Sequence, residues 1–220
     1  MDINDVVILD FETTGLTASV QRVIEVGAVR VDNGKITKRF AQLCCPGINI
    51  PYYITDLTGI TDEMVEDKPK PEQVMPELQS FIGRRPIIAH NAKFDQEFLY
   101  MEMRRARLYV NNPIFCTLKL SRAMIQDSEN HKLETLKSYL GYQPPDENAM
   151  AHRALHDAEA TATLWLYLKN KLLKLVGEDK LNIALLQKLN RMSHAKAVIF
   201  LSKFDVQLDI ESKRSEVLQT

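Results

Sequence analysis

The first apolar run of the chain ends directly in two acids, and this placement strongly constrains the fold. Val6-Val7-Ile8-Leu9 is short and rich in β-branched side chains, which predicts a buried strand. Asp10-Phe11-Glu12 follows without a break. In an extended chain residues i and i+2 point to the same face, so Asp10 and Glu12 project together while Phe11 points into packing. The run therefore predicts a core strand that carries two carboxylates on one face of a sheet.

Further strands follow early in the chain. Segments 23–31 and 36–44 are predicted strands, and Asp32-Asn33-Gly34 between them is a strong hairpin turn signal. Residues 86–90 form another short apolar run. Strands come first and helices increasingly later, with short strands interspersed. This order favours a mixed-sheet α/β domain over a doubly wound one.

Helices are predicted where apolar residues recur at helical spacing. Such spacing runs from Val74 to Ile82 and again after Asn91, a residue that can cap a helix. The longest predicted helix covers residues 153–176 and stops at Gly177. Residues 181–204 also look helical, and the polar residues 211–220 are expected to fray. We therefore divide the chain into a domain of residues 1–177 and a C-terminal helical extension of residues 178–220.

Composition excludes several classes of protein. The 220 residues are 45% hydrophobic and 26% charged, which is ordinary for one globular domain with a short appendage. No apolar run approaches the roughly 18 residues of a membrane span. The N-terminus lacks the basic region of a signal peptide, and three cysteines, two of them adjacent, fit reduced thiols. We expect a cytoplasmic protein without a membrane segment.

Net charge gives no general sign of nucleic-acid binding. The formal net charge is −1, so a whole-molecule basic field is absent. Binding to phosphates would need local clusters, and the candidates are Arg84-Arg85, Arg104-Arg105-Arg107 and Lys119 with Arg122. Any one of these clusters taken alone is best explained as a solvated surface.

Two further clusters contain acids that chemistry could use. Asp95 lies in the first turn of the helix after Asn91, where the helix dipole favours an anion. His152 and Asp157 are five residues apart, and five residues do not return to one helix face. If the two meet at one site, His152 should precede the helix while Asp157 lies in its first turns. His156 is the competing histidine, and a packing or surface role suits it better.

The paired acids of the first strand need a compensating charge. Two carboxylates ~4 Å apart repel by about 1 kcal/mol in water, and by several times that in a partly buried site. Either one of Asp10 and Glu12 is protonated or a cation sits between them. Taken alone, the pair also fits solvated residues at a strand end.

Three motifs together resemble a known family. Asp10-Phe11-Glu12-Thr13-Thr14-Gly15, then His90-Asn91-x-x-Phe94-Asp95, then His152-x-Ala154-x-x-Asp157-Ala158 are similar to the signature of DnaQ-like exonucleases. These form the DEDDh branch of the ribonuclease H-like superfamily. The resemblance covers about residues 5–175 and is closest to the proofreading exonucleases of DNA polymerase III. It implies a ribonuclease H-like fold, with a mixed five-stranded sheet flanked by helices.

The resemblance also implies the residues of the metal site. Asp10, Glu12, Asp95 and Asp157 match the four acids that hold two divalent cations, and His152 matches the general base. Asp10 would bridge the ions, and Asp95 would support the site directly or through water. An all-oxygen set suits two Mg²⁺ or Mn²⁺ ions better than Zn²⁺.

The resemblance extends to the pocket for the terminal nucleotide. Leu57-Thr58-Gly59-Ile60-Thr61 is similar to the substrate-side loop of the family. The predicted substrate-binding residues are Thr13, Thr14, Ile60, His90, Asn91 and Phe94.

The implied activity is 3′→5′ exonucleolytic release of nucleoside 5′-monophosphates. The expected substrate is single-stranded nucleic acid or a frayed 3′ end, with DNA favoured and a polymerase as partner. Two alternatives stay open. One is an exonuclease that trims RNA 3′ ends, because no motif here reports contacts to the 2′-OH. The other is a nucleic-acid-binding polymerase accessory protein without catalysis.

Overall fold

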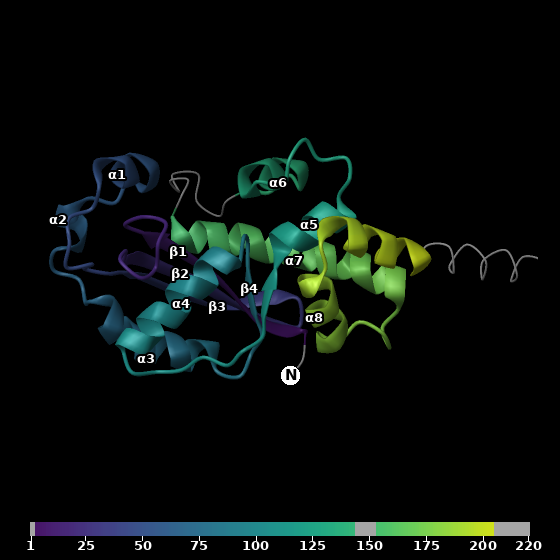
Figure 1. Cartoon of the computed structure of the whole chain (residues 1–220), viewed down its shortest axis with the longest axis horizontal. Helices are drawn as coiled ribbons and strands as arrows, with labels where there is room; N and C mark the ends of the chain where they lie inside the picture. Colours follow the sequence, from purple (N-terminus) through teal and green to yellow (C-terminus); the bar gives the residue numbers. More distant parts are fainter. Residues whose placement is uncertain (1–2, 144–152, 205–220) are drawn as a thin grey trace, which may run out of the picture.

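A mixed five-stranded sheet forms the centre of the molecule (Figure 1). The computed structural model describes residues 3–143 and 153–204. Within them the strands are β1 (Asp5–Thr13), β2 (Val23–Asp32), β3 (Lys35–Leu43), β4 (Ile87–Ala89) and β5 (Ile114–Cys116). Their order is β3-β2-β1-β4-β5; β1, β2 and β3 pair antiparallel, while β4 and β5 run parallel to β1. The mixed sheet predicted from the sequence is confirmed.

The hairpin between β2 and β3 forms where it was predicted. Asn33 and Gly34 connect the paired residues Asp32 and Lys35, with φ of 51° and 79°. Positive φ at both central residues is the geometry that matches the twist of a two-residue hairpin, and Asn-Gly adopts it readily. The turn therefore fixes the register of β2 against β3.

Helices cover both faces of the sheet. Their bounds are α1 (Tyr52–Thr58), α2 (Asp62–Val65), α3 (Pro71–Ile82), α4 (Lys93–Arg105), α5 (Thr117–Met124), α6 (Leu133–Tyr139), α7 (Ala154–Val176) and α8 (Ile183–Arg191). A further helical segment covers residues 194–204. In Figure 1 the α1–α2 pair lies at one end of the molecule, and α8 with segment 194–204 lies at the other.

Two local predictions are corrected. Asn91 does not cap α4: the N-cap is Ala92, without a side-chain bond, and Asn91 instead turns the backbone with φ of 59°. Asparagine tolerates this left-handed conformation, which the sharp turn after β4 requires. The predicted helix of residues 181–204 is also interrupted, because Met192 adopts an extended backbone with ψ of 150°.

Strand parity assigns the side chains of β1 to two separate cores. Val6 and Ile8 pack in the core that contains Trp165 of α7, whereas Val7 and Leu9 pack with α3 and α4. Even-numbered residues of β1 therefore face α7, and odd-numbered residues face the opposite layer. Asp10 and Glu12 continue the even series, so both belong to the α7 side of the sheet.

Gly27 allows α7 to approach the sheet closely. It pairs with Asp10 across β1 and β2, and a Cβ placed on it would lie 2.0 Å from the Ala154 carbonyl carbon and 2.2 Å from the Leu155 nitrogen. Only a residue without a side chain fits between the strand and the helix backbone at this point. The absent side chain therefore brings the first turn of α7 next to Asp10.

The C-terminal extension packs on the same core as α7. Leu186 and Leu189 of α8, and Ala197 and Leu201 of the following segment, belong to the apolar cluster of Trp165. Gly177 ends α7 with φ of 81°, as predicted. The domain boundary at residue 177 stays a prediction.

The structure also bears on the predictions about membrane helices and cysteine thiols. No helix among the described residues is long and apolar enough to cross a membrane. Cys44, Cys45 and Cys116 are all free thiols.

The contact at Gly27 yields a stability test. Gly27→Ala forces the α7 backbone away from β2, so we expect it to destabilise the protein by about 3 kcal/mol or more in urea unfolding. Ala41→Ser is the matched control, because Ala41 pairs with Gly27 on β3 but is exposed. If Gly27→Ala unfolds like the control, the close approach of α7 does not depend on this glycine.

Candidate metal centre and active site

Three carboxylates from two elements meet at the end of β1. Asp10 and Glu12 come from β1, and Asp157 comes from the first turn of α7. Each offers one oxygen, and the three oxygen atoms all lie within 4.8 Å of one another. Strand parity brings the first two together, and the close packing at Gly27 brings the third. This cluster is the candidate metal centre.

Asp95 lies beside this cluster on the other side of β1. It is buried in the first turn of α4, and its Oδ1 accepts a hydrogen bond of 3.2 Å from the Phe11 N–H. β4 pairs with β1 only at Val7 and Ile8, so strand pairing on that side ends before Phe11. Asp95 thus satisfies a backbone donor that the short β4 does not reach.

Burial and repulsion raise the pKa values of acids in and beside this cluster. Burial, followed by repulsion from Asp95, Asp157 and Glu12, raises the pKa of Asp10 well above its usual value. Burial and repulsion from Asp157 raise the pKa of Glu12 to about 8. Burial raises the pKa of Asp95 to about 7, although its hydrogen bonds with backbone N–H groups oppose this. Without a cation, the cluster therefore holds protons near neutral pH.

A partly buried ion pair anchors the start of α7. Glu25 of β2, opposite Glu12 in the register, accepts bonds of 2.7–3.1 Å from the Arg153 guanidinium. It also accepts a 3.0 Å bond from the Ala154 N–H, one of the free donors at a helix start. Since no side chain of α7 itself caps this end, Glu25 supplies the cap from the sheet. This anchor thereby fixes the position of Asp157, which lies in the first turn of α7.

Lys137 of α6 places an ammonium against the cluster. Its Nζ lies 2.6 Å from Asp157 Oδ1 and 2.7 Å from Glu134 Oε1. Burial alone would lower the pKa of Lys137, but these two partners raise it above the usual value. One monovalent charge offsets only part of the repulsion among four acids.

The donor set fits divalent cations that prefer oxygen. The clustered groups are carboxylates, their oxygen atoms converge, and their burial makes uncompensated negative charge costly. Histidine and cysteine are missing from this cluster among the described residues. Such a set favours Mg²⁺ or Mn²⁺ over softer metals.

His90, directly after β4, connects the start of α5 with the loop before α6. Its Nε2 lies 3.0 Å from the His131 carbonyl oxygen, so Nε2 carries the proton and donates. Its Nδ1 then accepts from the Thr117 hydroxyl at 3.0 Å. Burial lowers the pKa of His90 to about 4, which keeps the ring neutral.

The two threonines after the acids are also engaged within the protein. The Thr13 hydroxyl donates to the Gly15 carbonyl at 2.7 Å, and the Thr14 hydroxyl donates to Gln21 Oε1 at 2.7 Å. Thr14 Oγ1 in turn accepts from the Arg22 N–H at 3.0 Å. These bonds close the turn that follows β1.

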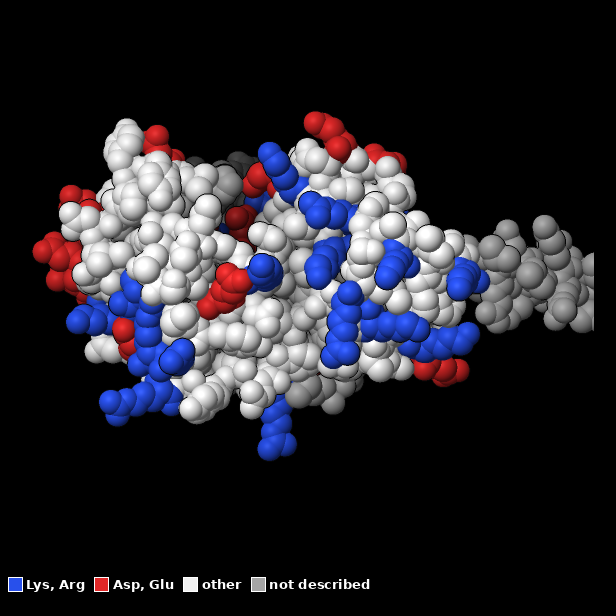
Figure 2. All heavy atoms as spheres, viewed as in Figure 1, with Lys and Arg blue, Asp and Glu red and all other residues white. Residues whose placement is uncertain are grey.

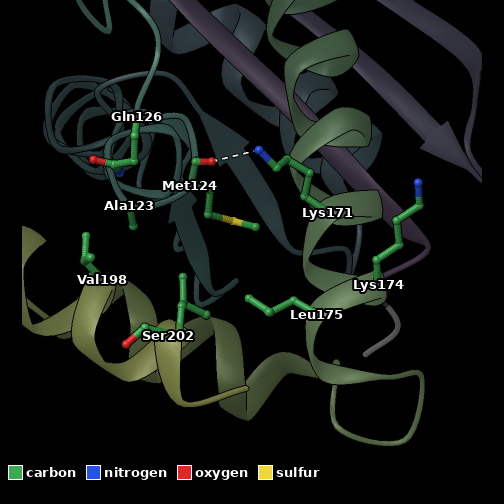
Figure 3. A pocket seen from close by; sticks show the side chains of 9 residues that line it. Ala123, Met124, Gln126, Lys171, Lys174, Leu175, Val198 and Ser202 are labelled. Carbon is green, nitrogen blue, oxygen red and sulfur yellow. Dashed lines mark hydrogen bonds between the residues drawn. The ribbon is translucent and has the colours of Figure 1, made fainter. Parts of the chain in front are cut away.

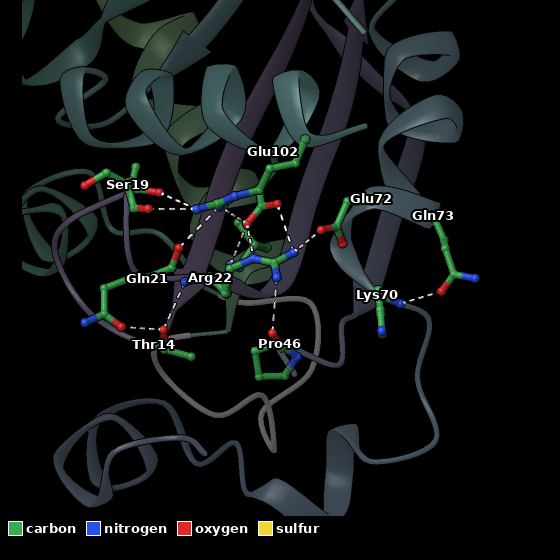
Figure 4. A network of polar contacts seen from close by, with 12 residues as sticks. Thr14, Ser19, Gln21, Arg22, Pro46, Lys70, Glu72, Gln73 and Glu102 are labelled. Carbon is green, nitrogen blue, oxygen red and sulfur yellow. Dashed lines mark hydrogen bonds and ion pairs between the residues drawn. The ribbon is translucent and has the colours of Figure 1, made fainter. Parts of the chain in front are cut away.

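A buried acid of α4 holds this turn in place (Figure 4). Glu102 is fully buried and pairs with Arg22 at 2.9 Å and with Arg105 at 2.8 Å. Arg105 also donates to the Ala18 and Ser19 carbonyls, at 3.0 and 3.1 Å. The network holds the segment from Thr14 to Arg22 against α4.

The other predicted substrate contacts lie in different surroundings. Ile60 is fully buried in a small cluster with Ile24 and Ile54, and Asn91 is exposed. Phe94 is half-buried, with its ring 4.9 Å from that of Phe98. Contact of these residues with a substrate stays a prediction.

The structure describes only one of the two histidines considered as general base. His152 lies outside the described residues. α7 begins at Ala154, so Asp157 lies in its first turn as predicted, and His156 lies within the helix. The choice of His152 as general base therefore stays a prediction from the sequence motif.

Sequence reasoning missed Gly27, Glu25 and Lys137. An isolated glycine inside a strand is typical of close backbone approach, and an acid within an apolar strand is typical of a paired buried charge. Both patterns were present in residues 23–31. For Lys137, no pattern in the sequence places its helix beside α7.

A separate cavity lies away from the acids (Figure 3). It has a volume of about 430 Å³ between α5, α7 and segment 194–204, and its lining includes Met124, Leu175 and Val198. Lys171 donates to the Met124 carbonyl at its edge, at 2.9 Å. Its lining contains no carboxylate, so it is not a candidate for the metal.

Comparison with known proteins places the chain in a family. The RNase_T family model, described as Exonuclease, matches residues 7–165. The chain belongs to this exonuclease family. The matched region contains β1, α4 and the start of α7, and thus all four acids.

Relatives of this exonuclease-family chain are bacterial DNA polymerase III components. It is 39% identical over 166 residues to the DNA polymerase III PolC-type protein of Caldanaerobacter subterraneus subsp. tengcongensis, which covers 76% of the chain but 12% of that relative. It is 35% identical to the DNA polymerase III subunit epsilon of Aquifex aeolicus, covering 76% of the chain and 81% of the subunit. The chain thus spans a small part of the PolC-type relatives.

A solved exonuclease has the same fold. Exonuclease X, determined in complex with 5′ overhanging duplex DNA, is 29% identical with a TM-score of 0.62, covering 76% of this chain and 92% of that chain. The predicted ribonuclease H-like fold and the resemblance to DnaQ-like exonucleases are confirmed.

The raised carboxyl pKa values predict how stability depends on pH. The pKa of Glu12 is about 8 in the folded chain and 4.5 ordinarily, so between these values the folded state holds a proton that the unfolded state releases. In EDTA, we therefore expect the free energy of unfolding to fall as pH rises from about 5 to 8. Each pKa unit corresponds to about 1.4 kcal/mol.

Glu12→Gln isolates this effect, because it removes the titrating group while keeping its size. Urea unfolding at several pH values should show a smaller fall for Glu12→Gln than for the parent chain. A Glu129→Gln variant, altered at an exposed loop acid, should follow the parent. Equal slopes for all three chains would contradict the raised pKa of Glu12.

Proposed function

We propose that the protein is a 3′→5′ exonuclease that releases nucleoside 5′-monophosphates from DNA 3′ ends with two Mg²⁺ or Mn²⁺ ions. The convergence of Asp10, Glu12 and Asp157 within 4.8 Å carries this proposal. Membership of the exonuclease family supports the same reaction class. Proofreading beside a polymerase fits the DNA polymerase III relatives.

Four acids would hold the ions. Asp10, Glu12 and Asp157 present converging oxygen atoms, and Asp95 lies behind them, against the Phe11 N–H. Two such ions, when bound, stabilise the charge on the attacking and leaving oxygens at phosphorus. Burial of these acids strengthens their attraction for dications, because solvent screens buried charges less.

His152 would act as general base and take the proton from the attacking water. A histidine near its ordinary pKa is neutral at mildly alkaline pH and can accept that proton. Asp157 lies five residues further on in the sequence and belongs to the carboxylate cluster. His156 is not assigned this role.

The preferred substrate is a single-stranded DNA 3′ end or a frayed terminus. The polymerase relatives and the DNA-bound Exonuclease X support DNA. Thr13, Thr14, Ile60, His90, Asn91 and Phe94 would surround the terminal nucleotide. The free cysteines suit a reducing cytoplasm.

Isosteric replacement of the acids tests the reaction. Asp10→Asn and Asp157→Asn should abolish the shortening of a 5′-labelled single-stranded DNA from its 3′ end with Mn²⁺, while the fold is preserved. Asp5→Asn is the control at the other end of β1 and should cleave like the parent. His152→Ala should slow cleavage by about 10²–10⁴-fold.

Several outcomes would contradict the proposal. These are full activity of Asp10→Asn, cleavage that survives EDTA, or loss of activity in His156→Ala but not in His152→Ala. Faster digestion of an RNA of the same sequence would favour RNA trimming. Binding of DNA without cleavage by the parent would favour a non-catalytic accessory protein.

A further inference from the structure

Part of the C-terminal extension carries cations and no acids. Residues 180–204 contain no Asp or Glu, and Lys188, Arg191 and Lys196 are all exposed. These three residues line one surface hollow of about 640 Å³ between the end of α8 and segment 194–204. Gln187 and Ser193 add polar groups to its wall. We call it the basic hollow.

The charge of the basic hollow is not neutralised by the described part of the protein. None of its three cations forms an ion pair with a carboxylate of residues 3–143 or 153–204. The Lys188 ammonium lies 4.3 Å from the centroid of the Phe200 ring, so a cation–π contact steadies it without cancelling its charge. The hollow therefore offers a positive surface to an anionic ligand.

The basic hollow is fixed to the sheet. The Asn190 amide accepts from the Cys116 N–H at 3.1 Å and donates to the Ile114 carbonyl at 3.2 Å. Leu186 and Leu189 on the inner face of α8 are buried in the main core. A ligand in the hollow would thus be held in a set position relative to β5.

α5 connects the basic hollow with the candidate active site. At its start, Thr117 bonds to His90, and Lys119 Nζ donates to the Asn190 carbonyl at 2.8 Å. Arg122 on the same helix is exposed and lies close enough to His90 to contribute to lowering its pKa. In Figure 2, basic side chains gather over α5, α8 and segment 194–204, on the face where acids show in a recess beside α6.

A row of positive charges that leads toward the candidate active site fits a nucleic-acid strand as ligand. Nucleic-acid backbones carry a phosphate at every nucleotide, and their affinity for basic surfaces depends on release of counterions. Single strands are commonly held in positive grooves that follow the backbone. The family match ends at residue 165, so the basic hollow belongs to the part of the chain outside it.

We propose that Lys188, Arg191 and Lys196 bind backbone phosphates of the DNA strand whose 3′ end enters the acidic cluster. The contacts fall on nucleotides several positions upstream of that end, with Lys119 and Arg122 along the way. This inference rests on the proposed function and specifies the substrate as a strand long enough to reach both sites.

Binding without cleavage tests the inference. The full chain is titrated in EDTA against a fluorescent dT25 strand, and anisotropy is recorded at several salt concentrations. At one salt concentration near 0.15 M, Lys188→Gln/Arg191→Gln/Lys196→Gln should bind ~10- to 30-fold more weakly, and its salt dependence should drop by about 2 in log–log slope.

Two matched variants keep the result interpretable. Lys35→Gln/Lys38→Gln/Lys68→Gln removes the same charge from exposed positions in β3 and in the loop after α2, and should bind like the parent. Lys188→Arg/Arg191→Lys/Lys196→Arg keeps the charge and should also bind like the parent. Unchanged thermal midpoints establish that all three variants are folded.

Parent-like binding by Lys188→Gln/Arg191→Gln/Lys196→Gln, hereafter the triple glutamine variant, would overturn the inference. Equal weakening of binding in the distal control would overturn it as well. Failure of the proposed function is seen separately, in the cleavage of dT25 by the parent chain with Mn²⁺. A parent that cleaves while the triple glutamine variant binds normally leaves the exonuclease intact and removes the basic hollow from its substrate path.

Discussion

Repulsion among clustered, partly buried carboxylates is the constraint around which the rest of the structure is arranged. Asp10 and Glu12 share a face because they lie two residues apart on one strand, and α7 adds Asp157. An isolated domain gains nothing from such an arrangement, since each added charge raises the cost of the others. Gly27 and the Glu25–Arg153 ion pair hold the helix start against that repulsion, and Lys137 offsets part of it. A rigid scaffold that maintains unfavourable electrostatics is what a high-affinity cation site requires.

The acids of the candidate metal centre and the cations of α5 and α8 lie in separate regions. Acids lie at the end of the central strand, and cations continue over α5 and α8 on the same face. The net charge of −1 hides this separation, because a sum over the chain carries no information on position. A strand of DNA could thus meet phosphate-binding cations first, while its terminal phosphodiester reaches the acids. The four acids lie within the family match, whereas the basic hollow lies in the C-terminal extension outside it.

Local patterns in the sequence predicted the elements that depend on local physics. The hairpin at Asn33-Gly34 and the shared face of Asp10 and Glu12 follow from turn geometry and strand period, and both are present. The mixed α/β class followed from the order of strands and helices, and the ribonuclease H-like fold followed from the motif resemblance. Contacts between distant segments were not predictable: β5 is three residues long, and Lys137 reaches Asp157 only after α6 docks on α7. Asn91 shows the limit of local rules, because the turn after β4 needed its left-handed backbone more than its side-chain cap.

The central claim is that Asp10, Glu12 and Asp157 jointly hold a divalent cation. Anomalous diffraction from crystals of the full chain soaked in Mn²⁺ tests it most directly, because the manganese signal locates the ion without reference to activity. The account predicts a peak at coordination distance, about 2.1 Å, from a carboxylate oxygen of each of the three residues. Absence of a peak there at saturating Mn²⁺, or a peak at acids elsewhere on the surface, would contradict it.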